Sequence, residues 1–135
     1  MSLNADNLEK SYKTLLKCYL DYQENQNSAL AEYIEDSCIK RFEYTLETAW
    51  KLMKKMLIKK YGKDESELTI NNIFRFSEGY GYCKNWETWK LYYQKRNNTA
   101  HEYNLEKSRE LVKIIPEFLA DVEFFIAEFK GNSDD

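Results

Sequence analysis

Hydrophobic residues recur at steps of three and four along most of this chain, and polar residues fill the positions between them. Spacing of this kind places the apolar side chains on one face of an α-helix. It predicts helices over about residues 4–23, 28–61, 69–78, 85–96 and 104–129. No segment has the convincing period-two alternation of a β-strand. The pattern therefore predicts an all-α fold, an antiparallel up-and-down bundle of four or five helices.

Most of the predicted helices have residues that are typical of helix ends. Polar side chains that can accept hydrogen bonds from the first backbone N–H groups precede four of the segments, namely Asn4 or Asp6, Thr69 or Asn71, Asn85, and Asn104. Gly62 stands where the long second helix is expected to end in the left-handed conformation. That helix is long enough to contain a break near residues 32–37. Pro116 predicts a kink or local break in the last helix.

Composition supports a folded helical protein. The 135 residues are 43% hydrophobic and include 11 Tyr, 7 Phe and 3 Trp, so a sizeable core is expected. Leu8, Leu15 and Leu20 are assigned to the apolar face of the first helix, and Trp50 and Trp89 are expected to anchor the core or an interface. Only 4 Gly and 1 Pro occur, few for a protein built on tight β-turns. We expect one domain over residues 1–135, with a disordered tail at 132–135.

Charge and cysteine content restrict the expected binding partners and cellular location of the protein. A net charge of −3 and a pI near 5.4 exclude bulk electrostatic attraction of nucleic acid, although they are compatible with a local basic site. Cys18, Cys38 and Cys83 are odd in number and widely spaced, as expected for reduced thiols in a cytosolic protein. The sequence has no apolar run long enough for a membrane span and no signal-peptide pattern. We therefore expect a cytoplasmic protein.

Residues 95–103 contain the best candidates for chemistry. His101 is the only histidine, and an imidazole exchanges protons near neutral pH. Arg96 carries a planar cation suited to phosphate oxygens, and Asn97 is its polar neighbour. Together these side chains suit a phosphodiester substrate. The competing interpretation, which residue types alone favour, is that Arg96 and His101 lie at a helix end and bind backbone carbonyls.

The spacing of this motif restricts how its residues can meet. In an unbroken helix, positions 96 and 101 lie about 140° apart around the axis, whereas positions 97 and 101 share a face. Arg96 and His101 therefore converge only if the chain bends between them or if a second subunit supplies one of them. A two-fold dimer would bring two such pairs to one seam. It would then supply both an acid and a base for cleaving RNA through its 2′-hydroxyl.

A row of lysines marks the second half of the long helix. Lys51, Lys55 and Lys59 recur every four residues and so share one face. Such a row suits a nucleic-acid backbone or an acidic partner. The commoner alternative is a solvated face whose aliphatic stems cover apolar surface.

Glu43 and Glu47 are one turn apart on the same predicted helix. We expect them to hold basic groups in place by pairing with Arg41, Lys51 or Arg96. Two acids without a nearby histidine make a poor metal site. The sequence therefore predicts no metal and no other cofactor.

Two segments resemble a known protein family. The sequence Arg96-Asn97-x-x-x-His101 is similar to the R-x4-6-H motif of the HEPN superfamily, and Tyr103 extends it to the R-x4-H-x-Y form. That form belongs to the HEPN partners of minimal nucleotidyltransferases, often called nucleotidyltransferase substrate-binding proteins. Residues 36–51, DSCIKRFEYTLETAWK, resemble the second-helix segment of the same family, and Trp89 also fits. The resemblance covers most of residues 1–130.

The resemblance implies a helical-bundle protein, commonly a homodimer, that is encoded beside a small nucleotidyltransferase. In toxin–antitoxin members of the family, the HEPN protein is a metal-independent endoribonuclease. By this resemblance Arg96 would bind the scissile phosphate, and His101 would act in proton transfer or transition-state stabilisation. Asn97 would orient the site. Tyr103 is similar to the tyrosine that the partner modifies with AMP, which adds negative charge beside the arginine and silences the nuclease.

Three functions remain open at this point. The first is the RNase toxin of a toxin–antitoxin pair, which binds and cleaves RNA in a dimeric Arg-His cleft. The second is a non-catalytic subunit that binds substrate for a nucleotidyltransferase. The third is a helical bundle that uses its tyrosine-rich surface only for protein contacts. Loss of RNA cleavage in Arg96→Ala or His101→Ala would separate the first function from the second.

Overall fold

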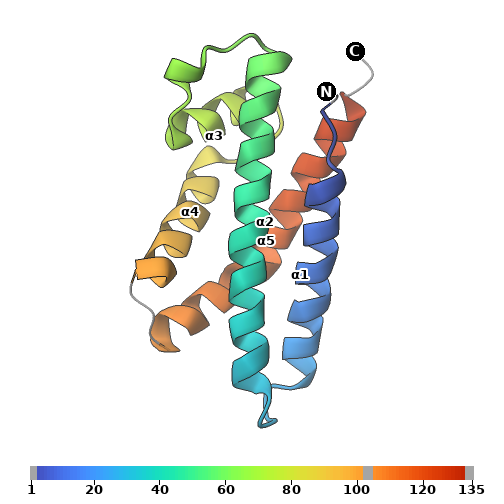
Figure 1. Cartoon of the computed structure of the whole chain (residues 1–135), viewed down its shortest axis with the longest axis vertical. Coiled ribbons are helices and arrows are strands. Elements are labelled where there is room, and N and C mark those ends of the chain that lie inside the picture. The colour runs from blue at the N-terminus through green and yellow to red at the C-terminus, as the bar shows by residue number, and fades with distance from the viewer. Residues whose placement is uncertain (1–2, 102–104, 133–135) are drawn as a thin grey trace.

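The computed structural model describes residues 3–101 and 105–132, with side chains described outside residues 98–101 and 105. Helices and turns account for the described chain, which confirms the predicted all-α class (Figure 1). The helices are α1 (Asp6–Glu24), α2 (Ala31–Lys59), the short 3-10 turn η1 (Glu65–Glu67), α3 (Ile70–Gly79), α4 (Trp86–His101) and α5 (Leu105–Gly131).

α2 is the element around which the other helices pack. It forms an antiparallel hairpin with α1 and also contacts α3, α4 and α5 (Figure 1). Its 29 residues continue without the break that was allowed near residues 32–37. At the usual rise of an α-helix it is about 43 Å long. Neither α2 nor any other helix in the described ranges is long and apolar enough to cross a membrane.

A hydrophobic core rich in aromatic side chains lies between the helices. The ring of Phe118 on α5 is 4.6 Å from the ring of Phe42 on α2 and 5.1 Å from that of Tyr92 on α4, centroid to centroid. Both contacts have the edge-to-face geometry that aromatic pairs prefer. Trp89 is 1% exposed beside them, so its predicted place in the core is confirmed. These rings fix α4 and α5 against α2.

The apolar face of α1 differs in part from the predicted one. Leu8 and Leu15 are buried, as expected, but Leu20 is 49% exposed. Ser11 and Cys18 occupy the buried positions of the intervening turns instead. Leu20 lies about 200° around the helix from Cys18, which turns it away from α2 and α5. The assignment of Leu20 to the core face was wrong.

Several helix starts are held by the predicted side chains. Oγ1 of Thr69 accepts a hydrogen bond of 3.2 Å from the N–H three residues later. Oδ1 of Asn85 accepts one of 2.9 Å from the N–H two residues later. Oδ1 of Asn4 likewise accepts from the N–H of Asp6 over 3.1 Å, although the residue before α1 is Ala5. The predicted cap Asn104 lies outside the described residues.

Gly62 and Pro116 were the two residues expected to end or interrupt a helix. Gly62 has a φ of +66°, and the N–H of Lys63 donates to the carbonyl of Leu57 over 2.9 Å, so the left-handed helix end is confirmed. Pro116 lies inside α5, which continues from Leu105 to Gly131, so the local break is wrong. The kink, which was the other expected outcome, stays a prediction.

Candidate functional site

Arg96 lies on the side of α4 that faces α2. Its Nε atom is 3.9 Å from Oε2 of Glu43 on α2, and its Nη1 donates to Oδ1 of Asn97 over 3.4 Å. The side chain of Arg96 keeps 35% of its surface exposed. The expected pairing of Glu43 with an arginine is therefore confirmed, and it positions the guanidinium at the surface between two helices.

The ion pair between Glu43 and Arg96 is loose. Burial raises the pKa of the Glu43 carboxyl, although the charges of Arg96 and Lys40 act to lower it. A bidentate arginine pair at close range would instead hold a carboxyl pKa below its ordinary value. Glu43 is thus one of the groups that position Arg96, at a distance longer than that of a close ion pair.

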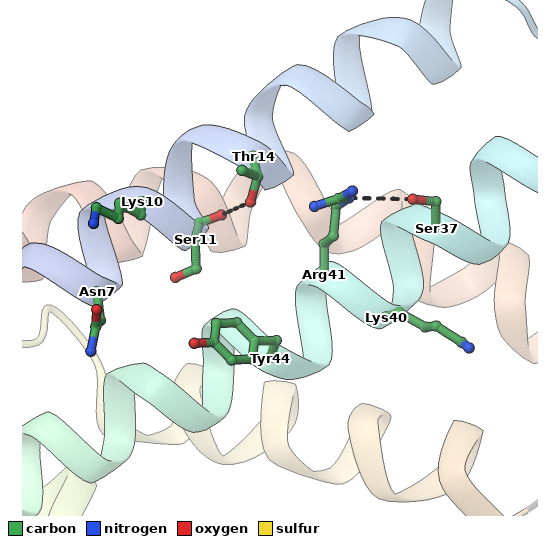
Figure 2. Close-up of a pocket in the computed structure, with 8 residues that line it drawn as sticks. All are labelled: Asn7, Lys10, Ser11, Thr14, Ser37, Lys40, Arg41 and Tyr44. Carbon is green, nitrogen blue, oxygen red and sulfur yellow. Dashed lines mark hydrogen bonds between the residues drawn. The ribbon is translucent and has the colours of Figure 1, made fainter.

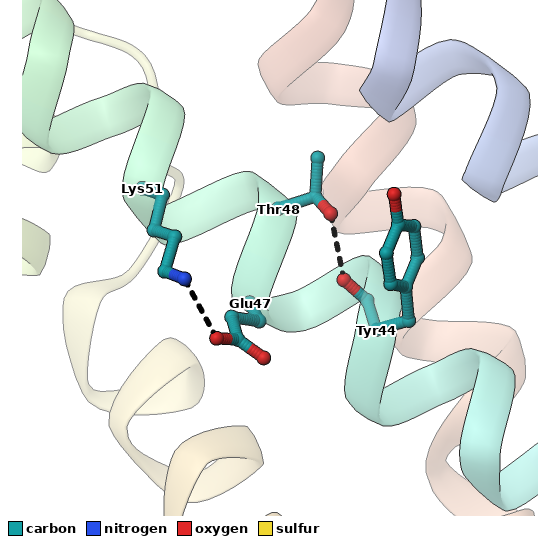
Figure 3. Close-up of polar contacts among 4 residues, drawn as sticks. All are labelled: Tyr44, Glu47, Thr48 and Lys51. Carbon is teal, nitrogen blue, oxygen red and sulfur yellow. Dashed lines mark hydrogen bonds and ion pairs between the residues drawn. The ribbon is translucent and has the colours of Figure 1, made fainter.

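Glu47 holds a different cation. Its Oε1 is 2.8 Å from Nζ of Lys51, and this hydrogen bond is the main cause that lowers the pKa of Glu47 (Figure 3). Figure 3 shows Glu47 and Lys51 pointing toward one another while the ring of Tyr44 points away from them. The two acids therefore hold basic groups in place, as expected for a structural role.

A small hollow of about 150 Å³ lies beside Arg96. It is lined by Leu46, Glu47, Trp50, Tyr93 and Arg96. Sites that enclose a whole small molecule usually measure about 300–1,000 Å³. The hollow, with its cation and two aromatic rings, therefore suits part of an extended substrate rather than an enclosed metabolite.

The rest of the motif is only partly described. His101 is the last residue of α4, and its side chain is outside the described ones; Tyr103 lies outside the described residues altogether. The backbone is helical from Arg96 to His101, so the chain does not bend between these positions. Positions five apart on a helix are about 140° apart around its axis. This removes one of the two ways in which Arg96 and His101 were expected to converge.

The lysine row occupies the exposed side of α2. Lys51, Lys55 and Lys59 are all exposed, and Lys51 is bound to Glu47. Contact of this row with RNA or a partner stays a prediction. In the part of the chain that the structure describes, no group of three or more His, Cys, Asp or Glu side chains is arranged to hold a metal ion.

Sequence reasoning missed a basic hollow between α1 and α2. It has a volume of about 480 Å³ and is lined by Asn7, Lys10, Ser11, Thr14, Ser37, Lys40, Arg41 and Tyr44 (Figure 2). A signal for it exists in the sequence, because Ser37, Arg41 and Tyr44 are spaced by four and three residues. Polar residues with this period share a helix face just as apolar ones do.

The chain was compared with known protein families and proteins. Residues 3–130 match the family model described as nucleotidyltransferase substrate binding protein like. The chain is also similar to the probable ribonuclease HepT of Haemophilus influenzae, with 25% identity over 107 residues. The matched region covers 78% of this chain and 73% of that relative.

Two solved structures share the helical fold. One, from Haemophilus influenzae, is described as revealing the fold of a substrate binding domain of a nucleotidyltransferase. It matches with a TM-score of 0.85 at 22% identity, over 94% of this chain and 99% of that chain. The other, from Thermus thermophilus, matches with a TM-score of 0.66 at 21% identity, over 84% of this chain and 97% of that chain.

Proposed function

Because the chain belongs to the nucleotidyltransferase substrate binding protein like family, we propose that it is the partner subunit of a minimal nucleotidyltransferase and a ribonuclease toxin that the partner controls. The observation that carries the nuclease proposal is the state of Arg96. Its side chain is 35% exposed and lies 3.9 Å from a carboxylate whose pKa is raised by burial. A guanidinium held in this way retains the charge and planar geometry that bind phosphate oxygens.

The proposed reaction is metal-independent cleavage of RNA. The 2′-hydroxyl attacks the adjacent phosphorus, the bond from phosphorus to the 5′-oxygen breaks, and a 2′,3′-cyclic phosphate forms. Arg96 neutralises the charge that develops on the phosphoryl oxygens, and Asn97 orients Arg96 through their hydrogen bond. His101 takes the proton from the attacking hydroxyl or gives one to the leaving oxygen.

We place this site at the cleft of a homodimer. The support is the continuous helix from Arg96 to His101, which keeps the two positions about 140° apart within one chain. A two-fold axis near the end of α4 brings Arg96 of one chain toward His101 of the other.

The nucleotidyltransferase is the proposed antitoxin. It transfers AMP from ATP to the hydroxyl of Tyr103 and releases pyrophosphate. Tyr103 is seven residues after Arg96 in the sequence. The added phosphate carries negative charge and competes with RNA phosphate for Arg96. Lys51, Lys55 and Lys59 are the proposed contacts with RNA or with this partner.

A second candidate function follows from the family description itself. In it, the chain is a non-catalytic subunit that binds the substrate of the nucleotidyltransferase. The description of the family model and that of the Haemophilus influenzae structure favour this function. It predicts that RNA stays intact in the presence of the purified chain alone.

Cleavage of RNA by the purified protein in EDTA tests the two functions. We expect the wild type to cleave and His101→Ala and Arg96→Ala to lose activity by about 10²- to 10⁴-fold, since each change removes a group that acts in the transition state. Arg109→Ala, which removes an exposed arginine of α5, is the matched control and should retain activity.

The same variants should be expressed in cells without the partner. Growth arrest by the wild type but not by His101→Ala supports the toxin function. Intact RNA with wild-type protein, after mass spectrometry shows Tyr103 unmodified, rejects the nuclease and favours the non-catalytic subunit.

A further inference from the structure

The exposed side of α2 carries one continuous row of cations and tyrosines. We call this row the α2 stripe, and it consists of Tyr33, Lys40, Arg41, Tyr44, Lys51, Lys55 and Lys59, all of them exposed. Measured around the helix axis from Tyr44, the other members lie within about 60°. The stripe is about 39 Å long. The lysine row and the hollow beside α1 are therefore parts of one surface.

The α1 side of this stripe is hollowed. Two adjoining hollows, of about 480 and 470 Å³, share Thr14, Ser37 and Arg41 in their linings. α1 adds Lys10 to one and Lys17 to the other. Together the linings contain four cations and a single carboxylate, in a chain whose net charge is −3. Positive charge is thus concentrated where the surface is concave.

These cations are not neutralised by neighbouring acids. Across residues 3–97 and 106–132, where side chains are described, no salt bridge involves Lys10, Lys17, Lys40 or Arg41. The Nε of Arg41 instead donates to Oγ of Ser37 over 3.3 Å, and Figure 2 shows the guanidinium directed toward α1. A solvated face that served only solubility would mix both signs of charge. The lining of these hollows instead has an excess of positive charge, with Asp21 as its one carboxylate.

The two tyrosines add flat apolar surface to the charge. Tyr33 is 73% exposed and Tyr44 is 58% exposed. They are eleven residues apart on one face, which is about 16 Å along the axis. Cations that follow a backbone, interleaved with exposed aromatic rings on which bases stack, are the combination that single-stranded nucleic acid requires.

We propose that the α2 stripe and the hollows between α1 and α2 bind a single strand of RNA and lead it to Arg96. Phosphates lie along Lys10, Lys17, Lys40 and Arg41, and bases stack on the two tyrosines. Lys40 lies about one helical turn before Glu43 on α2, and Oε2 of Glu43 is 3.9 Å from Nε of Arg96, so the track adjoins the proposed cleavage site. This inference rests on the proposed function for its ligand, the RNA substrate.

Binding of a fluorescein-labelled single-stranded RNA, followed by anisotropy over a range of salt concentrations, tests the track. The His101→Ala chain is the background, so that binding is read without cleavage. We expect Arg41→Ala to weaken binding about fivefold to tenfold and to reduce the slope of log K against log salt by ~0.7. Lys113→Ala removes an exposed lysine of α5 and should change neither quantity.

Two variants of Tyr44 test the aromatic part of the track. Tyr44→Ala should weaken binding at least fivefold, whereas Tyr44→Phe retains the ring and should bind like the background protein. Thermal unfolding of each variant shows that the fold is kept. Equal affinities for Arg41→Ala and Lys113→Ala, or equal losses for Tyr44→Ala and Tyr44→Phe, overturn the proposal.

The outcomes also separate this proposal from the nuclease itself. If wild-type protein leaves RNA intact but Arg41→Ala and Tyr44→Ala weaken its binding, the track stands and the nuclease fails. If RNA is cleaved through His101 while Arg41→Ala binds normally, the track fails and the nuclease stands. If Arg41→Ala loses the nucleotidyltransferase partner but not RNA, the surface is a protein interface and the track is rejected.

Discussion

Arg96 and Glu43 illustrate how one residue sets the chemistry of another across a helix boundary. The Glu43 carboxylate on α2 lies 3.9 Å from Nε of Arg96 on α4, so the ion pair joins the two helices. Burial raises the pKa of Glu43, although the charges of Arg96 and Lys40 act to lower it. If Arg96 binds phosphate as proposed, its position there depends on a residue of another helix.

Part of this residue-scale detail was predictable. The pairing of Glu43 with an arginine and of Glu47 with a lysine followed from charge and spacing, and both are confirmed. The exposure of Leu20 was not predicted, because periodicity gives a helix face only to within about one residue. The cationic hollow was not predicted because only the apolar residues were examined for helical periodicity, and the polar residues of its lining have the same period.

Tyr12 predicts a loss of stability at alkaline pH. Its hydroxyl donates to Oε2 of Glu123 over 2.8 Å, and burial followed by this bond raises the pKa of Tyr12 to about 12. An unfolded tyrosine ionises near pH ~10. The contribution of Tyr12 to the free energy of unfolding is therefore complete below that pH. It is lost as pH rises toward 12, because Tyr12 ionises first in the unfolded state.

Urea unfolding at several pH values between about 9 and 12 measures this effect. The stability of Tyr12→Phe should fall less steeply with pH than that of the wild type. Tyr33→Phe, which removes a hydroxyl that forms no hydrogen bond within the described residues, is the control and should follow the wild type. Identical slopes for wild type and Tyr12→Phe contradict the assignment.

At the scale of elements, local chemistry explains where helices begin and end. The caps at Thr69 and Asn85 and the left-handed Gly62 were predicted from residue type and are confirmed. Of the two outcomes expected at Pro116, the local break is wrong because α5 continues through it, and the kink stays a prediction. The boundaries were thus more predictable than the continuity of α5.

Alanine substitutions at two glycines near helix ends should change the stability of the protein in opposite directions. Gly62 has a φ of +66°, so Gly62→Ala should lower the free energy of unfolding by about 1 kcal/mol although no atom is near its Cβ position. Gly79 at the end of α3 has no positive φ and equal space, so Gly79→Ala should raise it by about 0.5 kcal/mol. Chemical denaturation of both variants checks the signs, and destabilisation of similar size at both positions would count against the conformational explanation.

At the scale of the whole molecule, the sequence predicted the fold class but not the neighbours of each helix. An apolar face shows that a helix side is buried without showing what covers it. That α2 contacts α1, α3, α4 and α5 together became visible only in the structure. The interface of the proposed dimer is less predictable still, since it also depends on a second copy of the chain.

Mixing two inactive variants tests whether the cleavage site is shared between chains. If each site takes Arg96 from one chain and His101 from its partner, a dimer of Arg96→Ala with His101→Ala contains one intact site. Random mixing should then restore about a quarter of wild-type RNase activity. The unmixed variants are the controls, and mixtures that stay inactive after subunit exchange place both residues in a single chain's site.

The central place of α2 has a consequence for how this protein can diverge. One side of the helix fills the core, a second holds the carboxylates near Arg96, and the third is the α2 stripe. Few positions around α2 can therefore be substituted without affecting the core, the carboxylates or the α2 stripe. The outer sides of α1 and α5 are less constrained. We therefore expect a substitution on α2 to be tolerated less often than one on the outer side of α1 or α5.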